Sequence, residues 1–394
     1  GCASAPAEIP TVPEACTVPQ SAPPLESTAS TPLNSATVGL VPSPGKMRME
    51  PFDTLARTSA RSAVRSTKLV ANGSDTPVPL RFVRSTTALV ESPSVFTVVT
   101  MSVTNMVAEV INAVASPEQK ADILPKLADG TYAAGAFCLT ESGAGSDPSA
   151  MRLRARKDGN DYVLDGEKIY ISSAEYAGVF VVWAVTDPEA PRGKGISVFL
   201  VPAGTPGLIV GKAEKKLGQH GSATNVVVFE NCRVPASAIM GRLDDGFRVA
   251  VGELAGGRIG IAALSLGIAR AAMDKAKAYV KERRQFGKPI AEFQGLQWMI
   301  ADRETDLEAA RLLILNAAAT KDRGGPYSKE ASMAKLFASE AAHRATDTAV
   351  QIFGGAGYIA EAGVERHLRD ARITRIYEGT SEIQRLVIAR ETLK

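Results

Sequence analysis

The sequence predicts a mainly α-helical protein with a β-rich domain in its middle. Two observations carry this prediction. Apolar residues recur at the spacing of amphipathic helices from about residue 95 to 134 and again from 246 onward, whereas residues 135–240 contain the short apolar runs and polar–apolar alternation typical of strands. The length of 394 residues is compatible with two or three domains.

Composition excludes several classes of protein. Lysine plus arginine number 45 and aspartate plus glutamate 42, so the net charge of +3 is too balanced for a dedicated nucleic-acid binder. The four cysteines form no metal or disulfide pattern, and we expect no metal site. The most apolar stretch, 96–115, contains Asn105, Glu109 and Asn112, which disfavours a membrane span. Because the N-terminus lacks the features of a signal peptide, we expect a cytosolic protein.

The first 94 residues differ from the remainder of the chain. They contain 13 of the 23 prolines. Residues 1–46 are rich in Pro, Ser and Thr, which is the composition of a linker or a disordered segment. Residues 48–85 are basic, and neither stretch shows a helical pattern of apolar residues.

Two helices are predicted directly after this region. Val107, Ile111 and Val114 share one helical face, and a second apolar pattern follows Pro117. Asp129-Gly130 is a turn signal, so we expect the second helix to end there.

The β-rich domain is predicted from alternation and from turn signals. Met151, Leu153 and Ala155 alternate with arginines, as in a half-exposed strand. Turns are predicted at 158–160 and at Asp165-Gly166, and further strands at 179–185, 196–201 and 226–229. Short strands at this spacing favour a barrel or a sandwich of about 100 residues.

Three helical stripes of apolar residues follow from residue 246 onward. Each stripe is about 20 residues long, and the breaks between them fall at 287–289 and 324–326. Long helices with short connections indicate an antiparallel bundle.

Four segments contain residues that folding alone does not require. The first two are rich in hydrogen-bond donors. In residues 137–147, Gly143 and Gly145 lie among serine and threonine side chains, so the loop could approach a ligand closely, although a plain turn is an equal alternative. In residues 282–290, Arg283 and Arg284 could bind a pyrophosphate. The alternative is that these two cations only stabilise a helix C-terminus.

The other two segments contain glycines, and the last of them also contains a carboxylate. Three glycines within 351–358 follow a predicted helix, as a helix cap or as a close approach to a ligand. In residues 375–385, Ser381 and Gln384 have the pattern of a capping box, so a helix is predicted to begin near Thr380. Glu378 lies just before that helix, either as a charge that stabilises its N-terminus or as a functional carboxylate.

The order and the residue sequences of these four segments resemble those of the acyl-CoA dehydrogenase flavoprotein family over about residues 95–394. Residues 216–224 and 232–235 also resemble that family. Within it, the chain is similar to the short-, medium- and branched-chain type, and Gly256-Gly257-Arg258 looks most like short- or branched-chain members.

The resemblance implies three domains: an N-terminal helical domain over 1–134, a middle β-barrel or sandwich over 135–244 and a C-terminal four-helix bundle over 245–394. It also implies that FAD lies between the β-domain and the bundle. Residues 1–94 do not match the family, and a frameshifted or misread segment competes with a genuine tail as the explanation. We predict that any ordered structure within 1–94 is mainly helical.

The resemblance also implies which residues bind the cofactor. Tyr170 would pack on the isoalloxazine ring and Ser172 would hydrogen-bond near its N5. Five positions resemble residues that reach the FAD of a neighbouring subunit, which implies a homo-oligomer, expected to be a tetramer: Arg283, Gln285, Phe286, Gln351 and Gly355. The remaining cofactor positions are Phe137, Leu139, Thr140, Ser146, Thr380 and Glu382. The position of Glu382 is commonly Gln in the family.

Glu378 matches the catalytic base of the family. Removing two hydrogens from an acyl thioester needs only one protein base, because the flavin accepts the other hydrogen as hydride. Burial can raise the pKa of a carboxyl group toward neutrality, and a backbone N–H at a helix start can polarise the thioester carbonyl. Some members place the base directly before the arginine that Arg258 resembles, but here that residue is Gly257. The implied substrate-binding positions are Ser146, Arg258, Tyr377 and Gly379.

The resemblance therefore implies FAD-dependent dehydrogenation of an acyl-CoA to trans-2-enoyl-CoA, with an electron-transfer flavoprotein as the electron acceptor. An acyl-CoA oxidase, which returns the electrons to oxygen, is the alternative enzyme. A DNA-binding relative of the same fold is the alternative from another class, and the near-neutral charge and Glu378 argue against it. The implied location is the cytoplasm in a bacterium or the mitochondrial matrix in a eukaryote.

Overall fold

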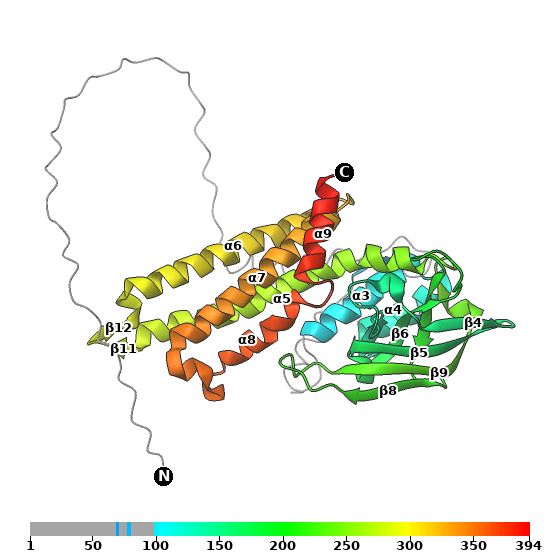
Figure 1. Ribbon diagram of the computed structural model, residues 1–394, viewed down its shortest axis with the longest axis horizontal. Helices are drawn as coiled ribbons and strands as arrows, with labels where there is room; N and C mark the ends of the chain where they lie inside the picture. The colour runs from blue at the N-terminus through cyan, green and yellow to red at the C-terminus, as the bar shows by residue number, and fades with distance from the viewer. Residues whose placement is uncertain (1–67, 71–76, 80–97) are drawn as a thin grey trace, which may run out of the picture. The chain divides into compact units, whose positions relative to one another are not determined.

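The computed structural model describes residues 68–70, 77–79 and 98–394 (Figure 1). Before residue 98 it describes two short strands, β1 (Lys68–Val70) and β2 (Pro77–Pro79), which pair antiparallel. The prediction of helical structure within 1–94 is therefore wrong for these strands; in β2 two prolines flank a valine, which favours extended backbone. The rest of 1–94, including the proline-rich and basic stretches, lies outside the described residues.

The two helices predicted after residue 95 are confirmed as α3 (Val98–Val114) and α4 (Pro117–Asp129). Val107 and Ile111 are fully buried, as their shared face predicts. The start of α4 is set by Ser116 and Gln119, each of which hydrogen-bonds the other's backbone. Its end is set by Gly130 at φ +86°, a conformation that favours glycine.

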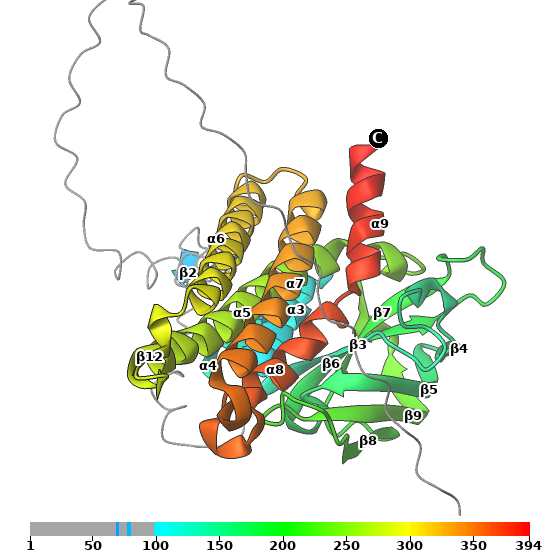
Figure 2. The ribbon, with the colours of Figure 1, turned by 60° about the vertical axis from the view of Figure 1, so that its left-hand side comes forward.

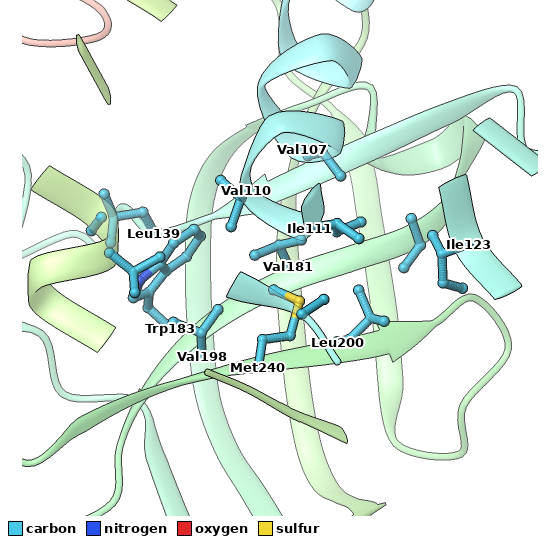
Figure 3. Close-up of a cluster of buried hydrophobic side chains, with 14 of the residues drawn as sticks. Val107, Val110, Ile111, Ile123, Leu139, Val181, Trp183, Val198, Leu200 and Met240 are labelled. Carbon is cyan, nitrogen blue, oxygen red and sulfur yellow. The ribbon is translucent and has the colours of Figure 1, made fainter. Parts of the chain in front are cut away.

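The β-domain is one curved sheet with the strand order β10-β7-β6-β4-β5-β9-β8, and β3 pairs in parallel with β6. Alternate residues of β6 point to different cores. Val181 and Trp183 pack toward α3 and α4 (Figure 3), whereas Phe180 and Val182 pack into a second cluster with β5, β7 and β9. The strands are β3 (Ala134–Cys138), β4 (Arg154–Asp158), β5 (Asp161–Ser172), β6 (Ala177–Val185), β7 (Ile196–Pro202), β8 (Leu208–Ala213), β9 (Thr224–Pro235) and β10 (Ile239–Met240).

One predicted turn of the β-domain is wrong. Asp165-Gly166 does not reverse the chain, because β5 continues through both residues with a shift of register against β9 between Leu164 and Gly166. Gly166 has φ +137°, and a Cβ there would lie 3.0 Å from the Cα of Leu153. The Asp-Gly pair therefore forms an irregularity that keeps β5 close to the neighbouring segment, which uses the same property of glycine as a turn.

The C-terminal part is a helical bundle in which α5, α6 and α7 lie side by side (Figure 2). Its core contains many alanines, such as Ala269 and Ala276 of α5 and Ala338 and Ala345 of α7, so the two helices can approach closely. The helices are α5 (Gly246–Glu282), α6 (Gln294–Asp322), α7 (Ser328–Phe353), α8 (Glu365–Arg372) and α9 (Ser381–Thr392), and a hairpin of β11 (Arg284–Gln285) and β12 (Lys288–Pro289) joins α5 to α6.

Helix α5 is the one helix of the described residues that is long and apolar enough to cross a membrane. In the fold it packs against α3, α6 and α7. About half (47%) of its most apolar window is buried by these contacts, as in the core helix of a folded domain.

The turn between β7 and β8 provides a stability test with a matched control. Gly204 and Gly207 both have positive φ, +78° and +84°. A Cβ on Gly204 meets no atom within 4 Å, but one on Gly207 would lie 2.3 Å from the carbonyl oxygen of Glu230. We expect Gly207→Ala to lower the free energy of unfolding by about 1–3 kcal/mol more than Gly204→Ala, because overpacking adds to the backbone penalty that both share. Equal losses in denaturant titrations would contradict the described packing of this turn.

Candidate functional site

A buried ion pair shapes the glycine-containing loop that follows β3. Lys168 is fully buried, and its Nζ donates to Glu141 Oε1 at 2.8 Å and to the carbonyl of Leu139 at 3.1 Å. Glu141 also accepts from the backbone N–H of Leu153 at 3.0 Å. Burial lowers the pKa of Lys168, and the carboxylate of Glu141 opposes this shift. Sequence analysis missed this pair, because a lysine within an alternating strand pattern is usually solvated.

The loop and β5 meet in a way that brings three predicted cofactor residues together. The N–H of Ile169 donates to the carbonyl of Thr140 at 2.9 Å, so Thr140 lies beside the strand that carries Tyr170 and Ser172. Tyr170 has φ +58°, and its side chain is 66% exposed. A large aromatic side chain in this strained, exposed state presents a flat apolar surface.

The other predicted residues of this loop are divided between core and surface. Ser146 is exposed. Phe137 packs its ring against Trp183 at a centroid distance of 4.4 Å, and Leu139 is buried in the same cluster (Figure 3). The side chains of Phe137 and Leu139 thus pack in the core and hold the loop there, while Ser146 is accessible to solvent.

The turn that carries Glu378 is strained. It follows a single helical turn after α8 and precedes α9, and Glu378 and Gly379 have φ +52° and +90°. Helix α9 begins as predicted, with Thr380 as its N-cap accepting from the N–H of Ile383. The predicted capping box of Ser381 and Gln384 is wrong, because Ser381 Oγ donates to Glu340.

The carboxyl group of Glu378 lies against α5 in a nearly dry environment. A Cβ on Gly257 would lie 2.2 Å from Glu378 Oε2 and 3.1 Å from Met106 Sδ, so no larger residue fits at position 257 without displacing the carboxylate. Glu378 Oε2 is buried and has no hydrogen-bond partner within the described residues. This contact explains why a glycine precedes Arg258.

Burial and three charged groups together determine the protonation of Glu378. Burial raises the pKa of Glu378 to about 7, with a smaller contribution in the same direction from Glu109 of α3. The cations of Lys335 in α7 and Arg258 in α5 oppose this shift. A carboxyl group with these neighbours can take up and release a proton near neutral pH.

The predicted substrate residues Arg258, Tyr377 and Gly379 lie around the same carboxyl group or its turn. Arg258 is buried, and its Nη1 donates to Ser332 Oγ at 3.2 Å, while its Nε has no partner within the described part of the chain. The hydroxyl group of Tyr377 is also buried without a partner there, and burial raises its pKa. Unpaired buried donors beside a carboxyl group are unfavourable unless a ligand pairs them.

The second group of predicted residues lies at the opposite end of α5, on the β11–β12 hairpin (Figure 1). Arg283 and Gln285 are exposed there, and Phe286 has φ +51° and is 92% exposed. Gln351 and Gly355 are also exposed. They lie near the same end of the bundle, since the ring of Phe353, between them in the sequence, stacks on that of Tyr279 near the end of α5 at 4.2 Å.

These two groups cannot belong to one site within one chain. Gly257 and Arg283 are separated by 26 residues of continuous helix, which at 1.5 Å per residue is about 40 Å. Thr380 and the exposed Glu382 lie with the first group, at the start of α9.

A loop of the β-domain fixes that domain against the bundle next to the first group. The N–H of Gln219 donates to Asp370 at 2.5 Å, and Arg369 donates to the carbonyl of Leu217 at 3.1 Å. A Cβ on Gly218 would lie 2.5 Å from the carbonyl of Arg369. The glycine of the segment 216–224 therefore allows the loop to touch α8, just ahead of the turn of Glu378.

The donor set fits FAD in character. Exposed Tyr170 with the hydroxyls of Thr140 and Ser172 suits a flat heteroaromatic ring, and Ser146 lies in a loop whose two glycines have no neighbour within 4 Å of an added Cβ. The exposed guanidinium of Arg283 suits a pyrophosphate, but it lies with the second group. The residues that suit a flavin ring and the arginine that suits a phosphate therefore lie at different places in one chain.

Two family models match the chain. Residues 136–232 match the acyl-CoA dehydrogenase middle domain, and residues 244–393 match the acyl-CoA dehydrogenase C-terminal domain. The second match contains the turn of Glu378.

Individual relatives are similar over the same region. The chain is 50% identical over 279 residues to the acryloyl-CoA reductase (NADH) of Anaerotignum propionicum, covering 70% of each sequence. It is 49% identical over 276 residues to an acyl-CoA dehydrogenase of Bacillus subtilis, covering 70% of this chain and 72% of that protein. Its fold is similar to that of butyryl-CoA dehydrogenase from Megasphaera elsdenii, with a TM-score of 0.74, 44% identity, and coverage of 75% of this chain and 77% of that one.

Proposed function

Because the chain belongs to the acyl-CoA dehydrogenase family, we propose that it dehydrogenates an acyl-CoA thioester to trans-2-enoyl-CoA with Glu378 as the base that takes the α proton. The observation that carries this proposal is the environment of that carboxyl group. It is buried against Gly257, its Oε2 has no partner within the described residues, and its pKa is raised to about 7.

Glu378 has the properties that proton abstraction from carbon requires. In the ionised form its Oε2 is free to accept a proton, because no donor of the described residues competes for it. Exclusion of water by Gly257 and Met106 strengthens its basicity compared with a solvated glutamate. The product of the step is a protonated, neutral carboxyl group, which a buried site tolerates well.

The backbone of the same turn can activate the substrate. The N–H of Glu378 donates no hydrogen bond within the described residues and lies immediately before helix α9. A backbone donor aimed at a thioester carbonyl would stabilise the negative charge that develops on its oxygen as the α proton leaves. One residue would then supply both the base and a carbonyl donor, so their spacing is fixed by covalent geometry.

The cofactor of the proposed reaction is FAD, which supplies the acceptor of the β hydrogen as hydride. Tyr170 would stack against its ring, and Thr140, Ser146, Ser172 and Thr380 would donate hydrogen bonds to it. Glu382 is exposed at the start of α9 and would lie toward the same cofactor. Phe137 and Leu139 would act through the backbone of their loop, since their side chains pack in the core.

The proposal includes a homo-oligomer, expected to be a tetramer. The separation of Arg283 from Gly257 along α5 supports the assignment of the exposed hairpin to the FAD of a neighbouring subunit. Gln285, Phe286, Gln351 and Gly355 would contribute to the same intersubunit contact. We further propose an electron-transfer flavoprotein as the electron acceptor and a short, medium or branched acyl chain as the substrate.

Replacing the base tests the proposed reaction. In a dye-reduction assay across a panel of acyl-CoA chain lengths, we expect Glu378→Gln to lower kcat by roughly 10²- to 10⁴-fold, because the amide cannot accept the α proton. Glu308→Gln, which removes an exposed carboxylate paired with Arg311 on α6, should match the wild type. Retained activity in Glu378→Gln, or an inactive wild-type enzyme across the whole panel, would overturn the proposed function. Fast reoxidation of the reduced enzyme by air would instead support an acyl-CoA oxidase.

The pH dependence of kcat follows from the raised pKa of the base. Glu378 is active when ionised and its pKa is about 7, so we expect kcat to be half-maximal near pH 7 and to fall about tenfold per pH unit below it. The control is Glu378→Gln, whose residual rate should show no such limb. A limb near 4.5, the ordinary value for a glutamate, would show that the carboxyl group is solvated in the working enzyme.

Co-expression of two inactive variants tests whether neighbouring subunits share a site. Glu378→Gln and Arg283→Ala damage different parts of the proposed site, so a mixed pair of subunits would contain one intact site and one doubly damaged site. Random pairing then predicts about one quarter of wild-type activity. As a control, Glu378→Gln with Gly257→Val should restore none, because both changes affect the same subunit's part of the site. Equal inactivity of both mixtures would contradict the shared site.

A further inference from the structure

Two buried side chains hold the turn of Glu378 from behind. Lys335 of α7 donates from Nζ to the carbonyl of Gly379 at 2.7 Å. Gln384 of α9 donates from Nε2 to the same carbonyl at 2.8 Å and to the carbonyl of Glu378 at 3.2 Å. Both side chains are fully buried. Donors from two different helices therefore converge on two consecutive carbonyl groups.

These carbonyl groups belong to the strained part of the backbone. Glu378 is in the left-handed conformation, which is unfavourable for a residue with a Cβ. Gly379 allows the close approach that follows, because a Cβ there would lie 2.7 Å from Gln384 Nε2. Without these two donors, the two carbonyl groups would lose these side-chain partners and the turn would have little reason to keep its conformation.

A lysine is an unfavourable choice for mere packing at position 335. A buried ammonium group loses its hydration, and burial lowers the pKa of Lys335 to about 8. Within the described residues its hydrogen bond runs to a carbonyl group and not to a carboxylate. A methionine or a leucine would fill the same volume without this cost, so the presence of a cation calls for a role that packing does not supply.

We propose that Lys335 and Gln384 are positioning residues for Glu378. Together they fix the two carbonyl groups of its turn, and so the direction of both its carboxyl group and its N–H, while Lys335 also favours the ionised base. This inference rests on the proposed function, because it assigns residues that serve the same base.

The two side chains differ in charge, and this difference makes the proposal testable. The charged groups that face Glu378 are Lys335 from α7, Arg258 from α5 and Glu109 from α3. Lys335 and Arg258 favour its ionised form, and Glu109 opposes it. Removing Lys335 therefore raises the pKa of the base, whereas removing the neutral amide of Gln384 disturbs only the geometry of the turn.

The experiment uses the full chain loaded with FAD and compares Lys335→Met, Gln384→Met and Lys277→Met. Lys277 is a matched control, because it pairs with Glu304 between α5 and α6 on the surface of the bundle. Two quantities are measured: kcat with butyryl-CoA across the pH range around neutrality, and exchange of α-deuterium from its 3-thia analogue into water. In the exchange the α C–D bond breaks, Glu378 takes the deuteron, and the α carbon regains a proton from water. No electron acceptor is consumed, because sulfur replaces the β carbon.

We expect both Lys335→Met and Gln384→Met to lower kcat and the exchange rate by about 10- to 100-fold, since a misplaced base loses its alignment with the α proton. Only Lys335→Met should move the lower limb of the pH profile, upward by about one unit. Lys277→Met should match the wild type in both measurements.

The inference would be overturned if both test variants had the same kcat, exchange rate and lower pH limb as the wild type. A loss confined to KM or to bound FAD would overturn it as well, because it would show that the two side chains only support the fold. If Lys335→Met does not fold, Gln384→Met and Lys335→Gln decide by the same criteria. A wild-type enzyme inactive on every acyl-CoA would instead overturn the proposed function.

Discussion

A glutamate can exchange a proton near neutral pH only if its surroundings raise its pKa, and the structure around Glu378 meets this constraint by burying the carboxyl group. Helix α5 can lie against the carboxylate only because residue 257 has no side chain. Helix α3 contributes Met106, whose Sδ would lie 3.1 Å from a Cβ on the same Gly257. The β-domain is fixed nearby through the contact of Gln219 with Asp370. Helical and β segments far apart in the sequence therefore meet where one side chain needs to be shielded from water.

Backbone strain marks the same places. Within the described residues, seven non-glycine residues have positive φ, and three of them, Tyr170, Phe286 and Glu378, are predicted site residues. Each costs on the order of 1–3 kcal/mol unless its surroundings enforce the conformation. For Glu378 the enforcing groups are identifiable as Lys335 and Gln384. Tertiary contacts hold the backbone of Glu378 in its strained conformation, so the sequence pattern alone does not reveal the strain.

The sequence contains enough to predict the helices and most strands and to single out Glu378 as the proposed base, but not what surrounds this carboxyl group. Periodicity identified α3 to α7 because their buried faces repeat, and the family resemblance identified Glu378. Lys335 was not predicted, because a lysine in a helix is usually solvated and its burial depends on three helices meeting. The Asp165-Gly166 turn was predicted wrongly because glycine permits a strand irregularity as readily as a reversal. Gln384 fitted a capping pattern, and only the tertiary structure directs it to the carbonyl groups of the turn.

The pKa of the base is a balance of opposing effects that no single residue determines. Burial alone would keep the carboxyl group protonated, and an acid that never ionises cannot remove a proton. The cations of Lys335 and Arg258 alone would lower its pKa below the ordinary value and make it a weak base. Because the folded-state pKa of about 7 lies above the ordinary 4.5, the folded protein binds this proton more tightly, and its stability falls as the pH rises between these values, by roughly 3 kcal/mol in full. The raised pKa therefore costs stability at neutral pH and leaves a carboxyl group that can both accept and release a proton there.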